Sequence, residues 1–581
     1  MCGIAGILGN SVNEHQLEKI VLSQHHRGPD NSSVWISEDA KVALGHNRLS
    51  IIDLTTAANQ PMKTADESLV IVFNGEIYNY KELINQLSDY PFKTHSDTEV
   101  ILAAYQKWGT QCLDKFIGMF AFAIWDKSKR ELFCARDRFG VKPFYYYFDN
   151  ETFYFASEIK GLHAVGIEKS VNEEIWSTYL SSGLYEHSEN TFWNNIMALP
   201  SGSYLLWKES KIEIFKWYKL HEQLKYGWDE RKESDLIEEY ISLLRDSIRL
   251  RFRSDVPVGF NLSGGLDSSI LLSLVDGFKG SGNDLKAFTF ATGNPLYDEI
   301  PWVKTMLGKT NHPLHICSLT PKEVPQLARE ITFAQDEPFG GVPTLAYSKI
   351  FKLARSLDVI VLLDGQGLDE QWAGYDYYQN HLGIEVKNEI VKGPVQASSN
   401  FVNSSDFLME DFNGLSKKAY KANHYGDSLR NAMHQDAFVT KIPRALRFND
   451  RISMNYSTEL REPFLDHRLF EFSFRVPNEL KIKNGVHKYL LRKLGDQLMP
   501  STVSQAPKRP VQTPQREWLK GDLRHWVEDC LTLVDTNYGG VWFKEGAIKQ
   551  LWSQYQKGQF DNSFFIWQWI SLALILEKVS K

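Results

Sequence analysis

The chain has 581 residues, of which 43% are hydrophobic and 24% are charged, and its formal net charge at pH 7 is −7. This length is too great for one hydrophobic core, so two large domains are expected. The composition is that of an ordinary globular protein. The negative charge and the lack of a basic tail or stripe argue against a protein built mainly to hold nucleic acid.

No apolar run is long enough to cross a bilayer, so membrane insertion is not expected. The best candidate, residues 564–576, is short and interrupted by Gln568, which predicts a buried C-terminal helix. The N-terminus has no positively charged segment before an apolar stretch, so secretion is not expected either. The five cysteines are odd in number and widely spaced. They indicate neither a disulfide framework nor a CxxC metal site, and they favour a reducing cytoplasm.

Strand and turn patterns dominate the chain up to about residue 205. Helical periodicity appears at 12–25 and at 97–108. Strands, several of them flanking short polar turns, are expected at residues 68–73, 120–125, 131–135, 145–148 and 152–156. The pattern predicts an α+β domain over residues 1–205, with helices that cover stacked antiparallel sheets.

A polar connection at 206–232 leads into a second domain, 233–581, where strands alternate with amphipathic helices. The expected strands are 256–262, 285–290, 314–319 and 359–363, and the expected helices are 268–276, 299–307, 322–332 and 345–355. This alternation predicts an α/β domain with a parallel sheet, helices on both faces and a helical C-terminal part. Residues 380–440 are polar and poorly patterned, which fits a helical insertion or a mobile segment.

The first residues, Met1-Cys2-Gly3-Ile4-Ala5-Gly6, suggest a nucleophile. If Met1 is removed, Cys2 carries both a thiol and a free α-amine that can act as its base. Reference pKa values of about 8.5 for the thiol and about 7.7–8.0 for the amine let this pair ionise near neutral pH. A retained Met1 would block the amine. Taken alone, a cysteine at this position is also compatible with no function.

Several further residues of the first half fit a site for an amide substrate. A thiolate that attacks a carboxamide needs donors for the oxyanion, and the Asn74 amide with the Gly75 N–H supplies such a pair. An amino-acid substrate also needs a guanidinium and a carboxylate, roles that suit Arg48 and Asp97. Taken separately, these residues also fit a turn, a surface ion pair and a helix N-cap.

These segments resemble the class II glutamine amidotransferase domain, an N-terminal-nucleophile hydrolase. The matching motifs lie in order at 2–6, 26–30, 48–53, 74–79, 118–122 and 135–140, so the resemblance covers about the first 200 residues. It implies that Cys2 forms a γ-glutamyl thioester from L-glutamine and releases ammonia. Asn74 and Gly75 would hold the oxyanion. The glutamine backbone would be bound by Arg48, Glu76 and Asp97.

Two glycine-rich loops follow expected strands in the second half. The first, 263–269, opens a helix, and its N–H groups and hydroxyls suit phosphate oxygens, although it lacks the lysine of the GxxxxGK[ST] loop. The second spans 364–370. Because such loops gather at the carboxyl edge of a parallel sheet, Asp267 and Asp369 are expected to lie close together.

Two hard carboxylates beside a triphosphate suit Mg²⁺ better than a transition metal. Lys488 is a candidate cation for the charge that develops on phosphate during adenylyl transfer. The plainer alternatives are a flexible turn with a helix cap at 263–269 and an ordinary surface lysine at 488.

Together with 461–466, these loops resemble the pyrophosphate-loop ATPase domain of asparagine synthetase and its relative β-lactam synthetase. The whole chain thus resembles a divergent glutamine-hydrolysing asparagine synthetase. The resemblance implies that ATP activates an acceptor carboxylate as an acyl-AMP and that ammonia reaches it through an internal tunnel. Lys488 and Gln366 would serve catalysis, and Asp267 and Asp369 would hold Mg²⁺. The ATP-binding residues would be Leu262, Ser263, Gly264, Gly265, Asp267, Ser268, Ser269, Phe290, Asp364 and Gly365.

The acceptor stays open because the second loop departs from the family pattern Ser-Gly-Glu-Gly-Ser-Asp-Glu. Asp364, Gln366 and Leu368 replace its serine, its first glutamate and its second serine, and a neutral glutamine cannot act as a base. The segment 336–343 also differs from the usual acceptor-side pattern. Aspartate is the default acceptor, and a uronic acid of surface-polysaccharide biosynthesis or another carboxylate is the alternative.

The sequence also leaves room for two other functions. The chain could be a glutaminase whose second half only binds a nucleotide or a partner protein. Transfer of ammonia to a sugar phosphate is disfavoured, because 263–269 indicates ATP cleavage. A homodimer is an open option.

Overall fold

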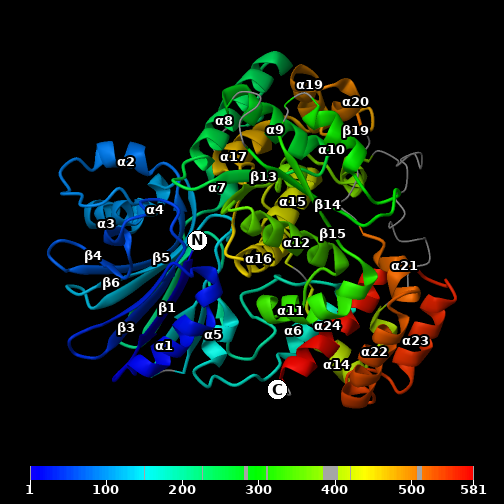
Figure 1. Ribbon diagram of the computed structural model, residues 1–581, viewed down its shortest axis with the longest axis horizontal. Coiled ribbons are helices and arrows are strands. Elements are labelled where there is room, and N and C mark those ends of the chain that lie inside the picture. The colour runs from blue at the N-terminus through cyan, green and yellow to red at the C-terminus, as the bar shows by residue number, and fades with distance from the viewer. Residues whose placement is uncertain are drawn as a thin grey trace.

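The computed structural model describes residues 2–149, 151–224, 227–279, 285–308, 310, 312–383, 404–418, 420–506 and 513–579. Figure 1 shows the first half in blue and cyan beside the second half, which runs from green to red. The first half contains antiparallel sheets, and the second contains a parallel sheet surrounded by helices. The expected α+β and α/β classes are therefore confirmed.

Two six-stranded sheets form the first half, with strand orders β10-β8-β9-β1-β3-β2 and β12-β11-β7-β6-β5-β4. The first sheet contains β1 (Cys2–Leu8), β2 (Asn31–Ile36), β3 (Val42–Arg48), β8 (Tyr145–Phe148), β9 (Phe153–Ala156) and β10 (Met197–Ala198). The second contains β4 (Met62–Lys63), β5 (Leu69–Ile77), β6 (Gly118–Asp126), β7 (Glu131–Arg136), β11 (Ser203–Lys208) and β12 (Lys211–Lys216). Side chains of both sheets, such as Leu44 and Val72, share one buried apolar cluster, so the sheets stack face to face.

Helices close the outer faces of this sandwich. Helix α1 (Glu14–Ser23) packs on β1 and β3, and α3 (Asp97–Trp108) packs on β5. Both begin at a capping side chain, because Asn13 accepts a hydrogen bond from the Gln16 N–H and Ser96 accepts one from the Thr98 N–H. The two helices expected from the periodicity are both present.

Strand β12 lies inside the segment 206–232 that was expected to be a connection. It pairs with β11 at the edge of the second sheet, and its residues are mostly exposed. An edge strand with little burial has a weak hydrophobic pattern, which explains why the sequence alone did not reveal it. The chain then passes through α7 (Leu220–Gln223) to α8 (Glu233–Arg251).

The second half is built on a parallel sheet of order β15-β14-β13-β16-β17. Its strands are β13 (Val258–Asn261), β14 (Ala287–Ala291), β15 (Leu314–Ser318), β16 (Val361–Leu363) and β17 (Glu459–Arg461). The chain enters at the central strand β13, adds β14 and β15 on one side, and later adds β16 and β17 on the other. The strand order thus reverses between β13 and β16, and ligands bind outside the carboxyl ends of strands at such a point.

The helices around this sheet include those expected after β13, β14, β15 and before β16. They are α9 (Leu266–Lys279), α10 (Ile300–Leu307), α11 (Val324–Gln335) and α12 (Val342–Ser356), followed later by α16 (Ile442–Met454), α17 (His467–Arg475) and α19 (Tyr489–Leu498). Within 380–440, the described part is largely helical, with α14 (Glu410–Gly414) and α15 (Ser428–Gln435). Residues 384–403 of that segment lie outside the described residues.

The C-terminal part consists of α22 (Arg524–Tyr538), α23 (Ala547–Gln556) and α24 (Ser563–Val579). Helix α24 is buried over most of its length, as expected, and it lies beside α6 (Glu173–Ser182) of the first half (Figure 1). None of the described helices has both the length and the hydropathy that a membrane span requires.

The hydrophobic cores cross the boundary between the halves. One buried cluster contains Trp176 and Phe192 together with Trp567, and another contains Tyr78 together with Phe470. Because neither half encloses these clusters alone, the two halves form one packed body.

Candidate functional site

The first site surrounds Cys2, the first described residue of β1. Cys2 is buried, and the register of β1 on β3 places it opposite Arg48. Its backbone N–H donates to Asn74 Oδ1 at 3.0 Å. Burial raises the pKa of the Cys2 thiol, and the nearby Leu49 N–H and Arg48 guanidinium oppose that rise. Met1 lies outside the described residues.

Asn74 faces this nitrogen from β5 of the other sheet. Its amide oxygen is engaged by Cys2, whereas its buried Nδ2 has no hydrogen-bond partner among the described residues. Gly75 follows with φ +153°, and a Cβ there would lie 2.1 Å from the Met119 carbonyl oxygen, so no larger residue fits. An orphaned amide donor beside a thiol is what an oxyanion would satisfy.

The three charged residues expected to bind glutamine are buried around the same place. The Arg48 guanidinium donates to the Thr55 carbonyl and to Asn59 Oδ1, both at 2.7 Å, and also to the Asp53 carbonyl. It therefore also fixes the loop that follows β3, in addition to any contact with a substrate.

The two carboxylates have raised pKa values. Burial raises the pKa of Asp97 to about 6, even though its Oδ2 accepts a hydrogen bond from the Ile77 N–H at 2.8 Å. Burial, reinforced by the neighbouring Glu459, raises the pKa of Glu76 well above its usual value. A positively charged group bound here would lower both pKa values, because it favours the ionised form.

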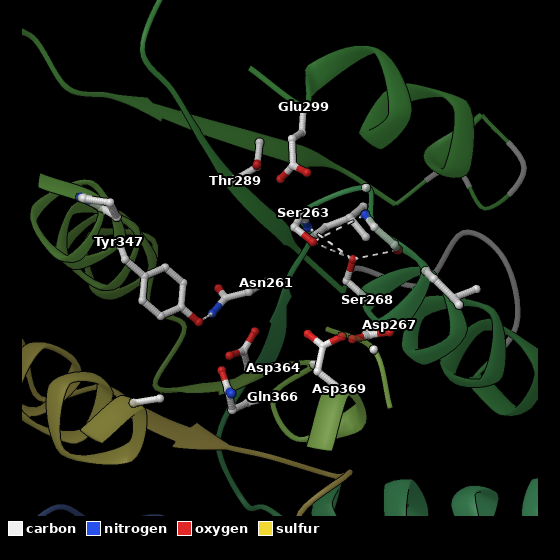
Figure 2. Close-up of a pocket in the computed structure, with 18 of the residues that line it drawn as sticks. Asn261, Ser263, Asp267, Ser268, Thr289, Glu299, Tyr347, Asp364, Gln366 and Asp369 are labelled. Atoms are coloured by element: carbon white, nitrogen blue, oxygen red, sulfur yellow. Dashed lines mark hydrogen bonds between the residues drawn. The ribbon is translucent and has the colours of Figure 1, made fainter. Parts of the chain in front are cut away.

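The second site is a cavity of about 460 Å³ at the carboxyl edge of the parallel sheet (Figure 2). Both glycine-rich loops contribute to its wall, as expected from the strand order. The expected residues that line it are Leu262, Ser263, Gly264, Gly265, Asp267, Ser268, Phe290, Asp364, Gly365, Gln366, Asp369 and Lys488. Ser269 does not line it and is fully buried, because one further position along α9 turns its side chain away from the cavity.

The first loop is held in place by its own hydroxyl groups. Ser263 Oγ and Ser268 Oγ are 3.0 Å apart, and Ser268 Oγ also accepts a hydrogen bond from the Ser263 N–H. These contacts close the turn between β13 and α9 and leave the start of the helix facing the cavity (Figure 2). Such a helix start favours a phosphate group.

Asp267 and Asp369 converge on one cation. Lys488 Nζ lies 2.6 and 2.7 Å from the two oxygens of Asp267 and 2.8 Å from Asp369 Oδ1. Burial alone would lower the pKa of Lys488, but the two carboxylates outweigh it and the pKa is raised. Gly374 lets this group form, because a Cβ there would lie 1.9 Å from Asp369 Oδ1 and 2.4 Å from Lys488 Cε.

The two carboxylates also fit a magnesium ion. They come from neighbouring loops, supply only oxygen donors and already surround one positive charge. If Mg²⁺ occupied this place with a triphosphate, the flexible Lys488 side chain would be free to reach the phosphate oxygens.

Several residues of the cavity were not foreseen from the sequence. Asn261, Thr289, Glu299 and Tyr347 all line it (Figure 2), and Asn261 Nδ2 donates to the Tyr347 hydroxyl at 2.6 Å. Asn261 ends strand β13, so its position at a carboxyl strand end was a usable signal. Glu299 lies at the start of α10 and Tyr347 lies on α12, so neither belongs to the two glycine-rich loops. Nothing in their local sequence predicts that they line the cavity.

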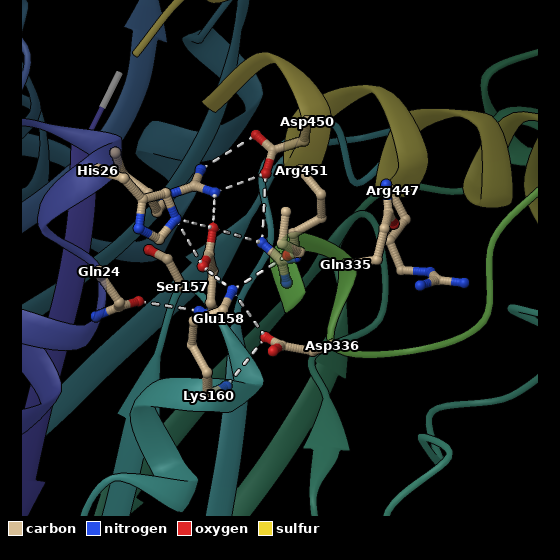
Figure 3. Close-up of polar contacts among 12 residues, drawn as sticks. Gln24, His26, Ser157, Glu158, Lys160, Gln335, Asp336, Arg447, Asp450 and Arg451 are labelled. Atoms are coloured by element: carbon tan, nitrogen blue, oxygen red, sulfur yellow. Dashed lines mark hydrogen bonds and ion pairs between the residues drawn. The ribbon is translucent and has the colours of Figure 1, made fainter. Parts of the chain in front are cut away.

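A buried polar network joins the first site to the second half (Figure 3). Arg27 is its centre, because it donates to the Cys2 carbonyl at 3.0 Å, to Glu158 at 2.8 Å and to Asp450 at 2.9 and 3.1 Å. Asp450 lies on α16, next to Asn449, which lines the cavity. The network therefore connects the backbone of the nucleophile to a wall of the second site.

The same network includes the start of the segment 336–343, which was expected on the acceptor side. Asp336 instead accepts a hydrogen bond from the Lys160 N–H at 3.0 Å and pairs with Lys578 at 2.8 Å. Only the end of the segment, at Pro343, lines the cavity. The difference arises because Asp336 caps the end of α11, where it contacts Lys160 of the first half, before the chain turns into α12.

Arg461 on β17 links the two sites more directly. Its Nη2 lies 3.4 Å from Glu76 Oε1, and its Nε donates to Glu459. Its carbonyl oxygen accepts the N–H of Asp364, the first residue of the second loop, at 2.9 Å. One residue of β17 therefore contacts a residue of each site.

Comparisons with known proteins match both halves. Residues 1–218 match the glutamine amidotransferase domain family, and residues 239–577 match the asparagine synthase family. Glutamine-hydrolyzing asparagine synthetase 1 of Bacillus subtilis (strain 168) is 29% identical over 98% of this chain and 95% of its own. Putative glutamine-hydrolyzing asparagine synthetase 2 of Methanocaldococcus jannaschii is 37% identical over 68% of this chain and 79% of its own.

The match to the asparagine synthase family covers more than half of the chain, and the family uses ATP. The chain belongs to the asparagine synthase family and is a glutamine-hydrolysing amidotransferase of the asparagine synthetase type, a carbon–nitrogen ligase.

Proposed function

We propose that this protein hydrolyses L-glutamine at Cys2 and uses the ammonia at the second site to amidate a carboxylate activated by ATP. The main structural support for coupling of the two sites is Arg461. Its side chain contacts Glu76 of the first site, and its carbonyl oxygen accepts a hydrogen bond from the Asp364 N–H of the second. Ammonia released at Cys2 would pass through the interior near Arg461 to reach the second site.

In the first half-reaction, the Cys2 thiolate attacks the glutamine carboxamide. The developing oxyanion receives hydrogen bonds from Asn74 Nδ2 and the Gly75 N–H. The C–N bond then breaks as the γ-glutamyl thioester forms, and the α-amine of Cys2 passes the former thiol proton to the leaving nitrogen, which departs as ammonia. Water then hydrolyses the thioester to glutamate. The nitrogen of Cys2, held on Asn74 Oδ1, becomes the free amine that takes the thiol proton once Met1 is removed. Arg48, Glu76 and Asp97 bind the amino-acid part of glutamine.

In the second half-reaction, an oxygen of the acceptor carboxylate attacks the α-phosphorus of ATP and pyrophosphate leaves. Ammonia then attacks the acyl carbon of the acyl-AMP, so that the products are an amide, AMP and one proton. Lys488 stabilises the phosphate charge. Asp267 and Asp369 would hold Mg²⁺, which when bound neutralises triphosphate charge. Gln366 lines the cavity and, being neutral, would orient a reactant rather than accept its proton.

Aspartate is the proposed acceptor, with a uronic acid or another carboxylate as the alternative. Exchange of labelled pyrophosphate into ATP should be measured across a panel of carboxylic acids, together with AMP and amide formation. Exchange and amide formation with aspartate are expected. Exchange with another acid but not with aspartate would assign a different acceptor while leaving the reaction type intact.

A glutaminase with a non-catalytic second half is the competing function, motivated by Gln366. The absence of AMP and amide with every acid of the panel, while glutamine is still hydrolysed, would establish it. Conversely, amide formed in equal amount to AMP would eliminate it.

The Cys2→Ala variant tests the first half-reaction. Glutamine-dependent synthesis should fall below detection, because no other described cysteine lies in this site, while synthesis from added ammonium salt continues. Mass spectrometry of the wild-type protein should show that Met1 is absent. Glutamine-dependent activity in the variant, or full activity of a protein that retains Met1, would refute the assignment of Cys2.

A further inference from the structure

Three histidines from distant parts of the chain form a cluster that shares no residue with the Cys2 site or with the lining of the cavity. They are His221 on α7, His424 in the loop before α15, and His434 on α15. Each histidine contributes one ring nitrogen, and these three nitrogens all lie within 4.8 Å of one another. Among the described residues, no other group of histidine, cysteine and carboxylate side chains is gathered in this way.

The rings pack directly on one another. The His221 and His424 rings are stacked with centroids 4.0 Å apart, and the His434 ring meets His424 at 4.7 Å. His434 is buried, His221 is partly buried and His424 is exposed, so the cluster is open to solvent on one side. Three nitrogen donors and one open side are a ligand set that divalent transition metals accept.

The surroundings fix two of the three histidines. The Tyr425 hydroxyl lies 3.1 Å from His434 Nδ1, which leaves Nε2 of that ring to face the cluster. The side chain of Asn431 accepts hydrogen bonds from the N–H groups of both His424 and Tyr425, at 2.8 and 3.0 Å. The loop is therefore tied to α15 independently of any ligand.

The third histidine has an unsatisfied nitrogen. His221 Nδ1 is buried and has no hydrogen-bond partner among the described residues.

One nearby charge opposes a cation bound at the cluster, and another favours it. The positive charge of Lys216 acts on His434 and opposes a bound cation. The Glu222 carboxylate lies 4.0 Å from His221 Nε2 and favours one. In a tetrahedral zinc site the nitrogens lie roughly 3.3 Å apart, and each ring must point the in-plane lone pair of its nitrogen at the metal. Because the His221 and His424 rings are stacked, at least one of them must rotate out of the stack to bind the ion. Such rotation is easy, because χ2 of histidine is a broad torsion.

We propose that His221, His424 and His434 form a binding site for one divalent transition-metal ion, with zinc as the best match, and that water completes the coordination. A metal here would connect the segment between the two halves to the inserted helix α15, more than 200 residues later in the chain. The site is independent of the proposed function.

The test measures zinc binding by the full chain, freed of metal with a chelator, in competition with a chromophoric zinc indicator. Wild-type protein should bind one zinc ion per chain at this site. The His221→Gln and His424→Gln variants should each bind it at least 100-fold more weakly. These two positions are chosen because they are less buried than His434 and their replacement should not disturb folding.

His525→Gln is the matched control, since His525 is exposed on α22 and pairs with Glu528. It should bind zinc like the wild type. Added zinc should raise the Tm of the wild type and of this control, but not of the two cluster variants. Unchanged zinc affinity in both cluster variants, or no zinc binding by the wild type, would overturn the proposal. Loss of zinc binding in Asp369→Asn, with zinc binding retained in the two cluster variants, would also overturn the proposal. The zinc ion would then be bound at the second site and not by the three histidines.

Discussion

At the scale of single residues, Asn74 and the carboxylates near it show how the first site is prepared. Asn74 accepts a hydrogen bond from the Cys2 nitrogen on its oxygen, and its NH₂ group has no hydrogen-bond partner among the described residues. Glu76 and Asp97 are buried with raised pKa values. Such groups cost folding free energy when no ligand is bound, and a substrate with a matching charge removes that cost.

The Asp97→Asn variant should show this cost as a pH-dependent gain in stability. Folding raises the pKa of Asp97 from 3.8 to about 6. The stability that comes from the protonated Asp97 carboxyl is therefore fully present below pH 3.8 and is lost as pH rises through 6. Asparagine does not ionise and can still accept the Ile77 N–H. At pH 8 the variant should therefore be more stable than the wild type by on the order of 3 kcal/mol.

Urea unfolding of the ligand-free protein at pH 4 and pH 8 measures this difference, which should nearly vanish at pH 4. The same variant should bind glutamine more weakly, seen as a raised KM at pH 8. A stability difference that is equal at both pH values would contradict the proposed ionisation of Asp97.

Gly374 allows the approach of Asp369 and Lys488, so Gly374→Ala should damage the second site alone. The added methyl group would overlap both side chains. Pyrophosphate exchange should fall by at least 100-fold, while glutaminase activity stays within about twofold of the wild type. Gly277→Ala on α9 is the control, because nothing lies within 4 Å of its added Cβ and alanine favours a helix. Equal exchange rates in the two variants would count against the arrangement around Lys488.

At the scale of elements, two strand–loop–helix units and helix α16 build the second site. The loop sequences alone predicted that 263–269 and 364–370 would meet, because the ends of parallel strands share one edge. Helix α16 was not foreseen at either site. It lines the cavity with Phe448 and Asn449 and presents Asp450 to Arg27.

The Asp450→Ala variant tests the link through α16. Arg27 would keep its buried charge but lose one of its two carboxylate partners, which costs about 3–5 kcal/mol in comparable sites. Because Arg27 also holds the Cys2 carbonyl, glutamine-dependent synthesis should fall more than ammonia-dependent synthesis. The ratio of the two rates is the measurement. Asp522→Asn, at an exposed position, should leave the ratio unchanged, and an unchanged ratio in Asp450→Ala would show that the link is only structural.

At the scale of the whole molecule, the two halves share their hydrophobic cores. Trp176 and Trp567 lie in one buried cluster, and Tyr78 and Phe470 lie in another. The polar network around Arg27 and Glu158 is buried at the same boundary. Separation of the halves would expose all of these groups to water.

Expression of residues 1–216 and 217–581 as separate chains tests this. The fragment 1–216 alone should aggregate or bind a hydrophobic dye, whereas the two fragments produced together should purify as one complex. Gel filtration and dye binding are the measurements. A fragment 1–216 that is monomeric, soluble and as stable as the intact chain would contradict the shared core.

The sequence by itself determined both fold classes, the order of most strands and the residues around Cys2 and the two glycine-rich loops. These are local features, because hydrophobic periodicity and strand-end glycines act within a few residues of the chain. The replacement of the family's glutamate by Gln366 in the second loop was also visible in the sequence. The assignments of individual residues to glutamine, ATP and Mg²⁺ remain predictions.

Only the tertiary structure decided how these pieces meet. It placed Arg461 between the two sites, buried Ser269, moved Asp336 to the boundary with the first half, and brought His221 to His424 and His434. Each of these contacts joins segments far apart in the chain, and burial and charge pairing between such segments depend on packing. No local pattern records that packing, so the sequence determined what each site is made of, and the fold determined which sites face one another.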